Sequence, residues 1–300
     1  MKNYLRKAGL VFAVLVTAGA IFFTACNKDN STSSQPQPTA NQQKVNLFLS
    51  DDPGYFDKVN LDIRKVEVLV DTCGNLGNES WNDRDRCGWD NDLGKKTDSC
   101  QVWDSLAIHP GVYDLLTLRN GTDTLLAGGN VHKGTMERIR ITIGSNNSLV
   151  KNGVTYPVTS LTGQSKIIIR VRHTEWDQLS SSNLQLWLDF DVQRSIIKTR
   201  DGKFILSPFI NVFTILKMGS LSGRVTPMDA YPVISVYDNN NDTLYALPWN
   251  DGSFKVRGLK PGNWNVFINA SAPYKDTTIT NVSVGKGQDT PLGQIKLSKQ

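Results

Sequence analysis

Short runs in which apolar and polar residues alternate begin at Lys44 and recur almost to the end of the 300-residue chain. Clusters of Gly, Asn, Asp and Pro separate these runs. Successive side chains of a β-strand point to opposite faces, so each run predicts a strand with one buried face. The chain has 24 Asp and 25 Asn but only 4 Glu, and Asp and Asn favour turns whereas Glu favours helices. The sequence therefore predicts an all-β fold built from sandwiches.

The apolar pattern also places individual strands and one irregularity. Apolar residues occupy odd positions at 45–49 and 59–63 but even positions at 66–70. This change of phase predicts a β-bulge near Arg64 and Lys65. Further strands are expected at 112–118, 137–143, 166–172, 184–192, 203–206 and 209–216, with one short helix within 173–182. Hairpin turns are expected at the dipeptides Asn152-Gly153 and Asp201-Gly202.

The N-terminal segment has the composition of an export signal. Basic residues within 1–7 precede an apolar run at 8–23 that is slightly short for a membrane span. Ala25 and Cys26 then resemble the end of the bacterial lipobox, although the two residues before them depart from its usual pattern. The resemblance implies that 1–25 is a lipoprotein signal peptide and that Cys26 becomes the lipidated first residue. An uncleaved anchor helix with an incidental cysteine is the alternative.

A polar stretch follows the lipobox. After the cysteine, residues 27–43 contain no apolar residue except Ala40, and such a composition cannot bury a core. We expect a lipidated cysteine followed by a disordered tether that attaches the protein to the membrane. Asn27, where some lipoproteins have Asp, resembles lipoproteins that are passed on to the outer membrane. The expected location is the cell envelope, as an outer-membrane lipoprotein, with surface exposure as one option.

The charge of the chain gives little reason to expect a nucleic-acid partner. The formal net charge is +5, from 33 Lys and Arg against 28 Asp and Glu. Three of the basic residues lie in the export segment, which leaves 30 against 28 in the rest of the chain. Nucleic-acid binding needs a clustered basic face. We therefore expect no nucleic acid among the partners.

Four strings between residues 45 and 191 resemble a known family. They are VNLFLSDDP (45–53), VYDLLTLRNG (112–121), RIRITIGSNN (138–147) and WLDFD (187–191). These strings are similar to those of the bacterial lipoprotein family called domain of unknown function 4382, over about 44–217. The resemblance implies a secreted, lipid-anchored β-sandwich, and it implies no activity because the family has none assigned.

A second β unit is expected at 219–299. Asp251-Gly252 is typical of a turn, Phe254 and Val256 would then point inward, and a second turn follows before Trp264. This string resembles the carboxypeptidase regulatory-like domain, a small prealbumin-like sandwich. The resemblance implies a non-catalytic module whose fold overlaps with carbohydrate-binding ones. Such an overlap is an analogy of fold and does not establish function.

The segment 71–100 interrupts the β pattern and contains three cysteines. Cysteines outside the cytoplasm tend to form disulfides, and with Cys26 lipidated one of the three is left over. Cys73 follows one expected strand and Cys100 precedes another, so these two would lie at the neck of a loop. We favour the pairing Cys73–Cys100, and the two pairings of Cys87 stay open. No spacing in the segment fits a zinc site.

The same loop carries acidic and aromatic residues. Asp83, Asp85, Asp90 and Asp92 offer oxygen ligands at alternate positions, but they do not complete a calcium loop, so calcium is a possible cofactor and a solvated loop is the alternative. No other cofactor is expected. Trp81 and Trp89 suggest a partner-binding loop, in which exposed rings would contact a glycan or a protein. The alternative is that both rings anchor the loop by packing.

Two carboxylates in a late strand are the remaining candidates for chemistry. Asp189 and Asp191 alternate with Leu188, Phe190 and Val192, so both face the side away from the apolar residues. Paired carboxylates can act as acid and base in glycoside cleavage. The alternative is the solvated face of an antiparallel strand, or carboxylates that are tied to nearby turns or arginines. We assign no catalytic residue, because no complete catalytic motif is present.

These features favour a non-enzymatic, lipid-anchored envelope protein of two β-sandwiches that binds a glycan or protein partner. The first alternative is a hydrolase of envelope or dietary polymers that uses Asp189 and Asp191. The second is a purely structural surface or adhesion component.

Overall fold

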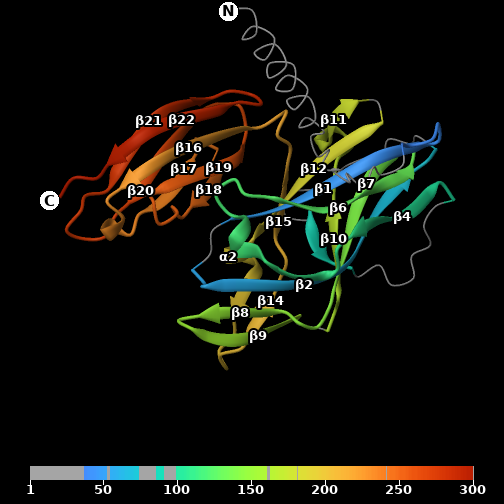
Figure 1. The fold of residues 1–300 in the computed structure, drawn as a ribbon, viewed down its shortest axis with the longest axis horizontal. Helices are drawn as coiled ribbons and strands as arrows, with labels where there is room; N and C mark the ends of the chain where they lie inside the picture. The colour runs from blue at the N-terminus through green and yellow to red at the C-terminus, as the bar shows by residue number, and fades with distance from the viewer. Residues whose placement is uncertain are drawn as a thin grey trace, which may run out of the picture. The chain divides into compact units, whose positions relative to one another are not determined.

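Almost every regular element of the described chain is a β-strand (Figure 1). The structure is a computed structural model that describes residues 37–52, 55–73, 86–90, 99–160, 163–180, 182–240 and 242–299. The helical segments among these residues span only one turn each. No helix in these ranges is long and apolar enough to cross a membrane. The all-β prediction is confirmed.

Fifteen strands form what we call the N-terminal lobe. Pairing along its main path runs β11-β12-β1-β6-β4-β2-β8-β9-β14-β13. These strands are β1 (Gln42–Asp52), β2 (Lys58–Asp71), β4 (Gln101–Ile108), β6 (Thr124–His132), β8 (Ser148–Lys151), β9 (Val154–Ser160), β11 (Asp177–Ser180), β12 (Asn183–Asp191), β13 (Ile196–Lys198) and β14 (Phe204–Leu206). Off this path lie β3 (Cys87–Trp89), β5 (Gly111–Asp114), β7 (Thr135–Ile143), β10 (Lys166–Arg170) and β15 (Ile210–Phe213).

Strand β1 joins two distant parts of the chain. It pairs in parallel with β12 and antiparallel with β6. Its alternate residues Val45, Leu47 and Leu49 are buried in one core with residues of β2 and β7, including Val68 and Ile139. The other face of β1 points away from this core, because side chains alternate along a strand.

The predicted β-bulge in the second strand is confirmed. The register between β2 and β7 shifts between Ile63 and Lys65. Ile63 and Val66 are nevertheless both fully buried. One extra residue on β2 therefore lets both halves of a long strand direct apolar side chains into the same core.

Three segments differ from the sequence prediction. The expected strand at 112–118 ends at Asp114 and continues as a 3₁₀ turn, Leu115–Leu118, because three closely spaced leucines are all buried and do not alternate. Only His173–Glu175 of the expected short helix is helical, also as a 3₁₀ turn, and the chain then enters β11. Strand β6 was not predicted, because Gly128-Gly129 in its centre is typical of a turn.

The last seven strands form a two-sheet sandwich, which we call the C-terminal lobe (Figure 1). One sheet has the order β19-β16-β22 and the other β18-β17-β20-β21. The elements are β16 (Gly219–Thr226), a 3₁₀ turn (Met228–Ala230), β17 (Val233–Tyr237), β18 (Thr243–Ala246), β19 (Ser253–Leu259), β20 (Gly262–Asn269), β21 (Thr277–Val284) and β22 (Asp289–Lys296). Phe254, Val256 and Trp264 are buried in a separate core, as predicted.

The predicted turn at Asp251-Gly252 is present and requires glycine. Gly252 has a φ of +85°, in the left-handed region that favours glycine. A Cβ atom at this position would also lie 2.1 Å from the carbonyl oxygen of Val225. Any larger residue would force the turn away from β16. Both the backbone conformation and the surroundings therefore require glycine at this position.

The two lobes belong to one compact unit, residues 37–300, and the residues that follow the 3₁₀ turn Leu115–Leu118 contact the C-terminal lobe. The Asn120 side-chain amide donates a hydrogen bond to the backbone oxygen of Leu247, at 2.7 Å. Next to it, the Arg119 guanidinium lies 4.4 Å from the ring centroid of Trp249, within the distance of a cation–π contact. A short segment of the N-terminal lobe is therefore held by both polar and aromatic contacts.

Separate cores predict that a fragment of residues 37–217 still folds without the C-terminal lobe. Phe213 would then lose its contact with Gly258. The two residues are close neighbours, because a Cβ atom added to Gly258 would lie 3.4 Å from Cβ and Cγ of Phe213. Exposing one large apolar side chain costs about 2 kcal/mol. We expect cooperative urea unfolding of the fragment, with a free energy of unfolding lower by about that amount than for the same lobe in the full chain. Aggregation of this fragment and of 219–300, beside a soluble full chain, would contradict separate domains.

Candidate functional site

The outer face of β1, β12 and β15 carries a row of aromatic rings. The strand register places Phe48 opposite Trp187 and Trp187 opposite Phe213. Phe48 and Trp187 stack with their ring centroids 4.6 Å apart, and Trp187 and Phe213 lie 6.2 Å apart. Trp187 is only 5% exposed. Large rings are therefore buried on the face of the sheet that points away from the core.

Asp123 fixes this aromatic row to the C-terminal lobe. One of its carboxylate oxygens accepts a hydrogen bond from the Trp187 ring nitrogen at 3.0 Å and forms an ion pair with the Arg257 guanidinium. Trp187 belongs to β12, whereas Arg257 belongs to β19. The carboxylate therefore connects side chains from both lobes at the edge of their contact.

A polar row lies next to the aromatic one. Ser50, Asp189 and Asn211 stand opposite one another on the same three strands. The Ser50 hydroxyl donates a hydrogen bond to Asp189 at 3.1 Å. Asp189 is 7% exposed, and Asp191 two residues later is also buried. The alternative of a solvated strand face is therefore wrong, because other parts of the chain cover this face, whereas the alternative of a carboxylate tied to a nearby turn and arginine describes Asp191.

Burial sets the protonation of Asp189. Loss of hydration raises its pKa to about 7, and the nearby negative charge of Asp191 adds to this rise. Hydrogen bonds from Ser50 and Asn211 act in the opposite direction but do not cancel it. Near neutral pH, Asp189 is therefore present in both its protonated and its ionised form.

Asp191 has a different environment. It caps the single helical turn α2 (Val192–Ser195), where its carboxylate accepts a hydrogen bond from the backbone N–H of Arg194 at 2.9 Å. The Arg194 guanidinium also lies 3.7 Å from the other carboxylate oxygen. Burial raises the pKa of Asp191, while the hydrogen bond and charge of Arg194 lower it. Asp191 thus has a cationic partner.

Both carboxylates line a cleft of about 560 Å³. The N-terminal lobe contributes β12, β15 and the residues after α2 to this cleft. The C-terminal lobe lines it with Asp242, Thr243, Leu244, Lys260 and Trp264. The volume lies within the range of small-molecule sites in proteins, about 300–1,000 Å³.

Several ion pairs lie around the cleft, and among the described residues none of them includes Asp189. Lys260 pairs with Asp242 at 2.6 Å, and Arg86 pairs with Glu175 at 2.7 Å. The other pairs are Arg172–Glu175, Arg194–Asp191 and Arg257–Asp123. Within the described ranges, the ion pairs give Asp189 no cationic partner. It is the acid of the cleft whose charge the protein does not compensate.

A much smaller pocket, of about 20 Å³, lies beside Asp189. Ser50, Asp51 and Asn120 line it together with Asp189, and the cationic residues Lys255 and Arg257 also line it. The side-chain oxygen of Asn120 is buried and accepts no hydrogen bond within the described residues, while its amide nitrogen donates to Leu247. The pocket has room for one group of the size of a water molecule.

Sequence reasoning missed Ser50, Asn120 and Asn211. Ser50 occupies a polar position of a predicted strand, and this alternation could have placed it on the same face as Asp52. Its position beside Asp189 depends on the pairing of β1 with β12, strands that are 139 residues apart at this contact. Asn120 gives no signal in the sequence beyond its position in a turn.

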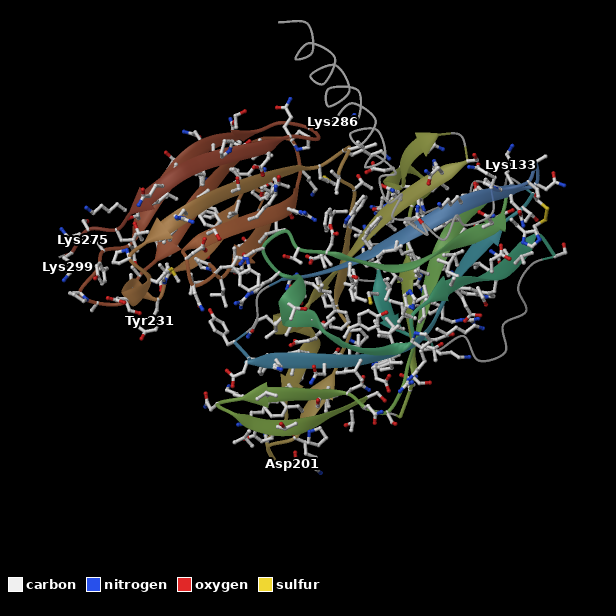
Figure 2. The ribbon with its side chains drawn as sticks, viewed as in Figure 1. Lys133, Asp201, Tyr231, Lys275, Lys286 and Lys299 are labelled. Carbon is white, nitrogen blue, oxygen red and sulfur yellow. A yellow bond between two sulfur atoms is a disulfide. The ribbon has the colours of Figure 1, made fainter. Side chains whose placement is uncertain are left out.

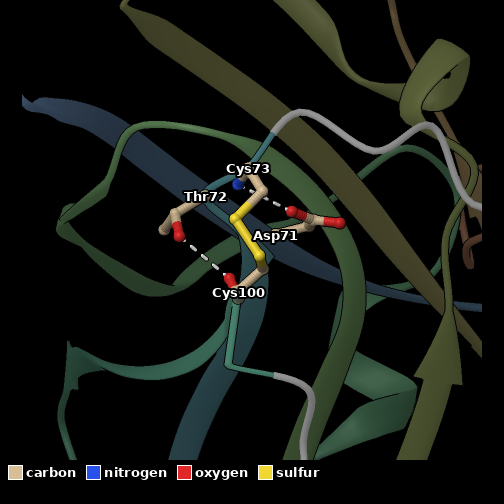
Figure 3. The surroundings of a disulfide bond; sticks show 4 residues. All are labelled: Asp71, Thr72, Cys73 and Cys100. Atoms are coloured by element: carbon tan, nitrogen blue, oxygen red, sulfur yellow. Dashed lines mark hydrogen bonds between the residues drawn. A yellow bond between two sulfur atoms is a disulfide. The ribbon is translucent and has the colours of Figure 1, made fainter.

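The predicted disulfide Cys73–Cys100 is present in the structure (Figure 3). Its two Cα atoms are 5.4 Å apart, and it closes the loop between β2 and β4. The backbone N–H and the hydroxyl of Thr72 both donate to the backbone oxygen of Cys100 at 2.9 Å, and Asp71 accepts from the N–H of Cys73. Cys87 is the free cysteine among the described residues, and burial raises the pKa of its thiol to about 12.

Removal of this disulfide should destabilise the protein. The bond joins residues 27 positions apart, and closing such a loop stabilises a folded chain by about 3 kcal/mol. We expect the double variant Cys73→Ser/Cys100→Ser to lose about this free energy of unfolding in urea. A reducing agent should lower the urea midpoint of the unaltered protein and leave that of the double variant unchanged. An unaltered protein that is insensitive to reduction would refute the role of this bond.

The structure gives Trp89 a packing role. Trp89 is the last residue of β3, pairs with Ile167 of β10, and packs against the main core. This placement favours loop anchoring over the exposed partner-binding surface that we considered for Trp81 and Trp89. Trp81 lies outside the described residues, and so does Cys26.

The calcium hypothesis is only partly addressed by the structure. Asp83, Asp85 and Asp92 lie outside the described residues, and Asp90 lies 3.9 Å from the Arg140 guanidinium, which partly neutralises it. Asp71, Cys73 and Cys100 come close enough together to suggest a metal site, but both cysteines are in the disulfide. Calcium binding stays a prediction.

The geometry defines an all-β protein of two lobes with a charged cleft between them. The chain belongs to the family described as "Domain of unknown function (DUF4382)", which matches residues 42–208. This match confirms the family expected from the four strings, and the family description assigns no activity. The curated proteins contain no match to this chain.

Several solved structures are similar to this chain at low identity. A minor pilin of Streptococcus agalactiae is 11% identical, with 85% of this chain and 96% of that one covered and a TM-score of 0.22. A shaft pilin of Lactobacillus rhamnosus GG is 7% identical, with 86% and 98% covered and a TM-score of 0.23. A type II cohesin–X-dockerin complex of Acetivibrio cellulolyticus is 23% identical, with 27% and 58% covered and a TM-score of 0.22. Scores this low carry no argument about function.

Proposed function

We propose that the protein is an exported, lipid-anchored envelope protein whose cleft binds a glycan or protein partner without transforming it. The observation that carries this proposal is the buried and uncompensated Asp189 at the wall of a cleft of about 560 Å³. Proteins rarely bury an acid without a charged partner unless the group has a function. A binding role uses the carboxyl group as it is found, with no further catalytic group required.

The lining of the cleft suits a ligand with many hydroxyl groups. Asn211 and the paired side chains Lys260 and Asp242 offer hydrogen-bond donors and acceptors in fixed positions. Phe209, which is partly exposed, adds ring surface beside them. Apolar rings next to a small number of placed polar groups are typical of small-molecule sites, and saccharides present both kinds of surface. A glycan is therefore the partner that we favour.

Filling the cleft tests this proposal. Thr243 is exposed at the start of β18 and lines the cleft, so Thr243→Trp should obstruct it. The matched control is Thr278→Trp, an exposed position on β21 that does not line the cleft. The probes are soluble oligosaccharides from peptidoglycan, chitin, cellulose and xylan. We expect Thr243→Trp to weaken binding of the best probe at least tenfold, whereas equal binding by both variants would refute the cleft as the site.

The envelope location rests on the sequence and on the disulfide. The apolar segment and Cys26 resemble a lipoprotein signal, and disulfides persist in compartments outside the cytoplasm. Cys26→Ser should abolish metabolic labelling with a fatty acid and release the protein from membranes. Labelling that survives this substitution would refute the lipid anchor while leaving the cleft proposal untouched.

A hydrolase is the second candidate, because Asp189 and Asp191 line one cleft with different environments. A carboxyl group with a pKa of about 7 can donate a proton, and a neighbour paired with arginine can stay ionised. Release of reducing ends from the same oligosaccharides, abolished by Asp189→Asn, would support this candidate. Binding without turnover would support the first proposal, and neither binding nor turnover would favour a structural surface component.

A further inference from the structure

We propose that the cleft binds an acidic glycan, and that the Arg194 guanidinium receives the carboxylate of a uronic acid residue in it. This inference rests on the proposed function and specifies the chemistry of the ligand. A cleft that binds neutral glycans through hydroxyl groups alone would overturn the inference and leave the proposed function intact.

Arg194 is an arginine of the cleft wall whose guanidinium is held in position but takes no part in a hydrogen bond. It belongs to the single turn α2 and lies over the Phe209 ring, 4.4 Å from the ring centroid. Its Nε atom is 3.7 Å from a carboxylate oxygen of Asp191, which is longer than a hydrogen bond. Within the described residues, the guanidinium makes no other polar contact. Because the side chain is 62% exposed, its N–H groups are accessible to a ligand.

A guanidinium held in this way suits a carboxylate. Its N–H donors form a planar fork that can bind both oxygens of one carboxylate, and stacking on an aromatic ring orients the plane of the fork before a ligand arrives. Charge-assisted hydrogen bonds of this kind are stronger than neutral ones, and they gain further where cleft walls exclude part of the solvent.

The charges that line the cleft leave room for an anion. The five cations are Arg86, Arg172, Arg194, Arg257 and Lys260, and the four acids are Glu175, Asp189, Asp191 and Asp242. Arg86 and Arg172 share Glu175, at 2.7 and 3.3 Å. Arg257 pairs with Asp123, which lies outside the lining. Among these groups the charges balance only while Asp189 is ionised. Protonation of Asp189 leaves one positive charge in excess, which a ligand carboxylate can balance.

Asp189 does not exclude an anion, because burial favours its neutral form. Loss of hydration raises its pKa to about 7, so a large fraction of the carboxyl group is protonated near neutral pH. A protonated carboxyl group donates a hydrogen bond, which a carboxylate or a hydroxyl oxygen of the ligand can accept. The buried acid then acts as a neutral donor in the same cleft as the guanidinium.

The rest of the wall favours a sugar over an acidic peptide. Asn211 and the paired side chains of Lys260 and Asp242 line the same cleft and offer donors and acceptors for hydroxyl groups. A uronic acid carries hydroxyl groups and a carboxylate on one ring. The side chain of a glutamate or an aspartate carries the carboxylate alone and makes no use of these groups.

The experiment compares oligosaccharides that differ in the charge of one kind of group. The probes are trimers of galacturonate, glucuronate, mannuronate and guluronate, each as the free acid and as its neutral methyl ester. Titration calorimetry of the detergent-solubilised full chain at pH 6 should show binding of one free acid that is tighter than binding of its ester by about tenfold or more. This comparison uses the unaltered protein, so it does not depend on the folding of any variant.

Two variants assign the preference to Arg194. Arg194→Gln removes the charge and the fork but keeps the backbone N–H that Asp191 accepts, so the fold is retained and the free acid and its ester should bind within about twofold of each other. The matched control is Arg224→Gln, because Arg224 is also an exposed arginine with one acidic partner, Asp251, and does not line the cleft. This control should keep the preference. A preference that survives Arg194→Gln would refute the assignment.

The pH dependence of binding tests the part of Asp189. The charged groups that face it come from its own strand, from β1 and from β19, and they are Asp191, Asp51, Lys255 and Arg257. With a pKa of about 7, the protonated fraction of Asp189 rises about tenfold from pH 8 to pH 6, and the affinity for the free acid should rise by the same factor. In Asp189→Asn, which leaves the facing groups in place, this change should fall below about twofold. A dependence that persists in this variant would overturn the role of Asp189 as a neutral donor.

Other outcomes also decide the inference. Binding of the esters that equals or exceeds that of the acids would refute the carboxylate and leave a cleft for neutral glycans. Binding of a sulfated galactose trimer without binding of any uronate would refute the carboxylate and indicate a sulfate ester. Binding of a triglutamate peptide without binding of any trimer would refute the sugar and indicate a protein partner. If no trimer binds and Thr243→Trp changes the binding of no other probe, both the inference and the proposed function fail.

Discussion

Asp189→Asn should stabilise the protein at pH 8 and have little effect at pH 4. The pKa of Asp189 is about 7 in the folded protein, against 3.8 for an unperturbed aspartate. Between these values the folded state binds a proton that the unfolded state has released, so the stability of the unaltered protein falls as pH rises through this window. Above pH 7 both states are ionised, and the folded state then carries the full cost of a buried charge, about 4 kcal/mol.

Urea unfolding at a series of pH values measures this effect. The difference in free energy of unfolding between Asp189→Asn and the unaltered protein should rise from near zero at pH 4 to about 4 kcal/mol at pH 8. Asp201→Asn provides the opposite case. Hydrogen bonds from Lys203 and Thr199 lower the pKa of Asp201 to about 2, so its contribution is lost only as pH falls below about 4. A difference for Asp189→Asn that does not vary with pH would contradict the environment described for this residue.

Trp187→Ala should be the most damaging single substitution on the outer face of β12. The ring stacks between Phe48 and Phe213, is almost fully buried, and donates a hydrogen bond to Asp123. Replacing a buried tryptophan by alanine typically lowers the free energy of unfolding by about 3–5 kcal/mol, because a cavity replaces the ring contacts. We expect a loss of about 4 kcal/mol in urea unfolding.

Two further variants separate the contributions of Trp187. Trp187→Phe keeps much of the stacking and loses the hydrogen bond to Asp123, so it should cost about 1–2 kcal/mol. Tyr231→Ala removes an exposed ring from an outer turn and should change stability by less than about 0.5 kcal/mol (Figure 2). Equal losses for Trp187→Ala and Tyr231→Ala would show that the aromatic row is not packed as described.

The strands were predictable because their residues alternate strictly. The change of phase between Ile63 and Val66 was sufficient to place a bulge within β2, since both residues must reach one core. The pattern failed at Leu115–Leu118, where Leu115, Leu116 and Leu118 are buried in a 3₁₀ turn and Thr117 is exposed. Alternation identifies a strand with one buried face, and it does not predict a turn in which adjacent residues are both buried.

The surroundings of Asp189 were not predictable, because they depend on contacts between distant segments. The sequence correctly placed Asp189 and Asp191 on the face opposite Phe190. It gave no indication that β1 pairs with β12, or that the C-terminal lobe faces this surface across a cleft. The local alternation of apolar and polar residues determines on which side of a strand a residue lies, whereas long-range pairing determines whether that side is exposed to solvent.

The inserted segment 71–100 also contains one feature that the sequence predicts and one that depends on long-range pairing. The disulfide could be predicted because two strands that pair bring Cys73 and Cys100 together at the neck of the loop. The position of Trp89 could not be predicted, because β3 is only three residues long and pairs with the distant strand β10. Such a short strand has too few residues to show a pattern.

A direct measurement of the Asp189 carboxyl group tests the central claim that this acid is buried in the cleft without a cation. Carbon-13 NMR of the aspartate side-chain carboxyl carbons, recorded from pH 3 to 9, follows the titration of each residue, and the Asp189→Asn spectrum identifies the resonance of Asp189. We predict one resonance with a midpoint of about 7 that is missing from the variant. A midpoint for Asp189 below about 5 would mean that water or a cation already stabilises its charge, and would contradict this account.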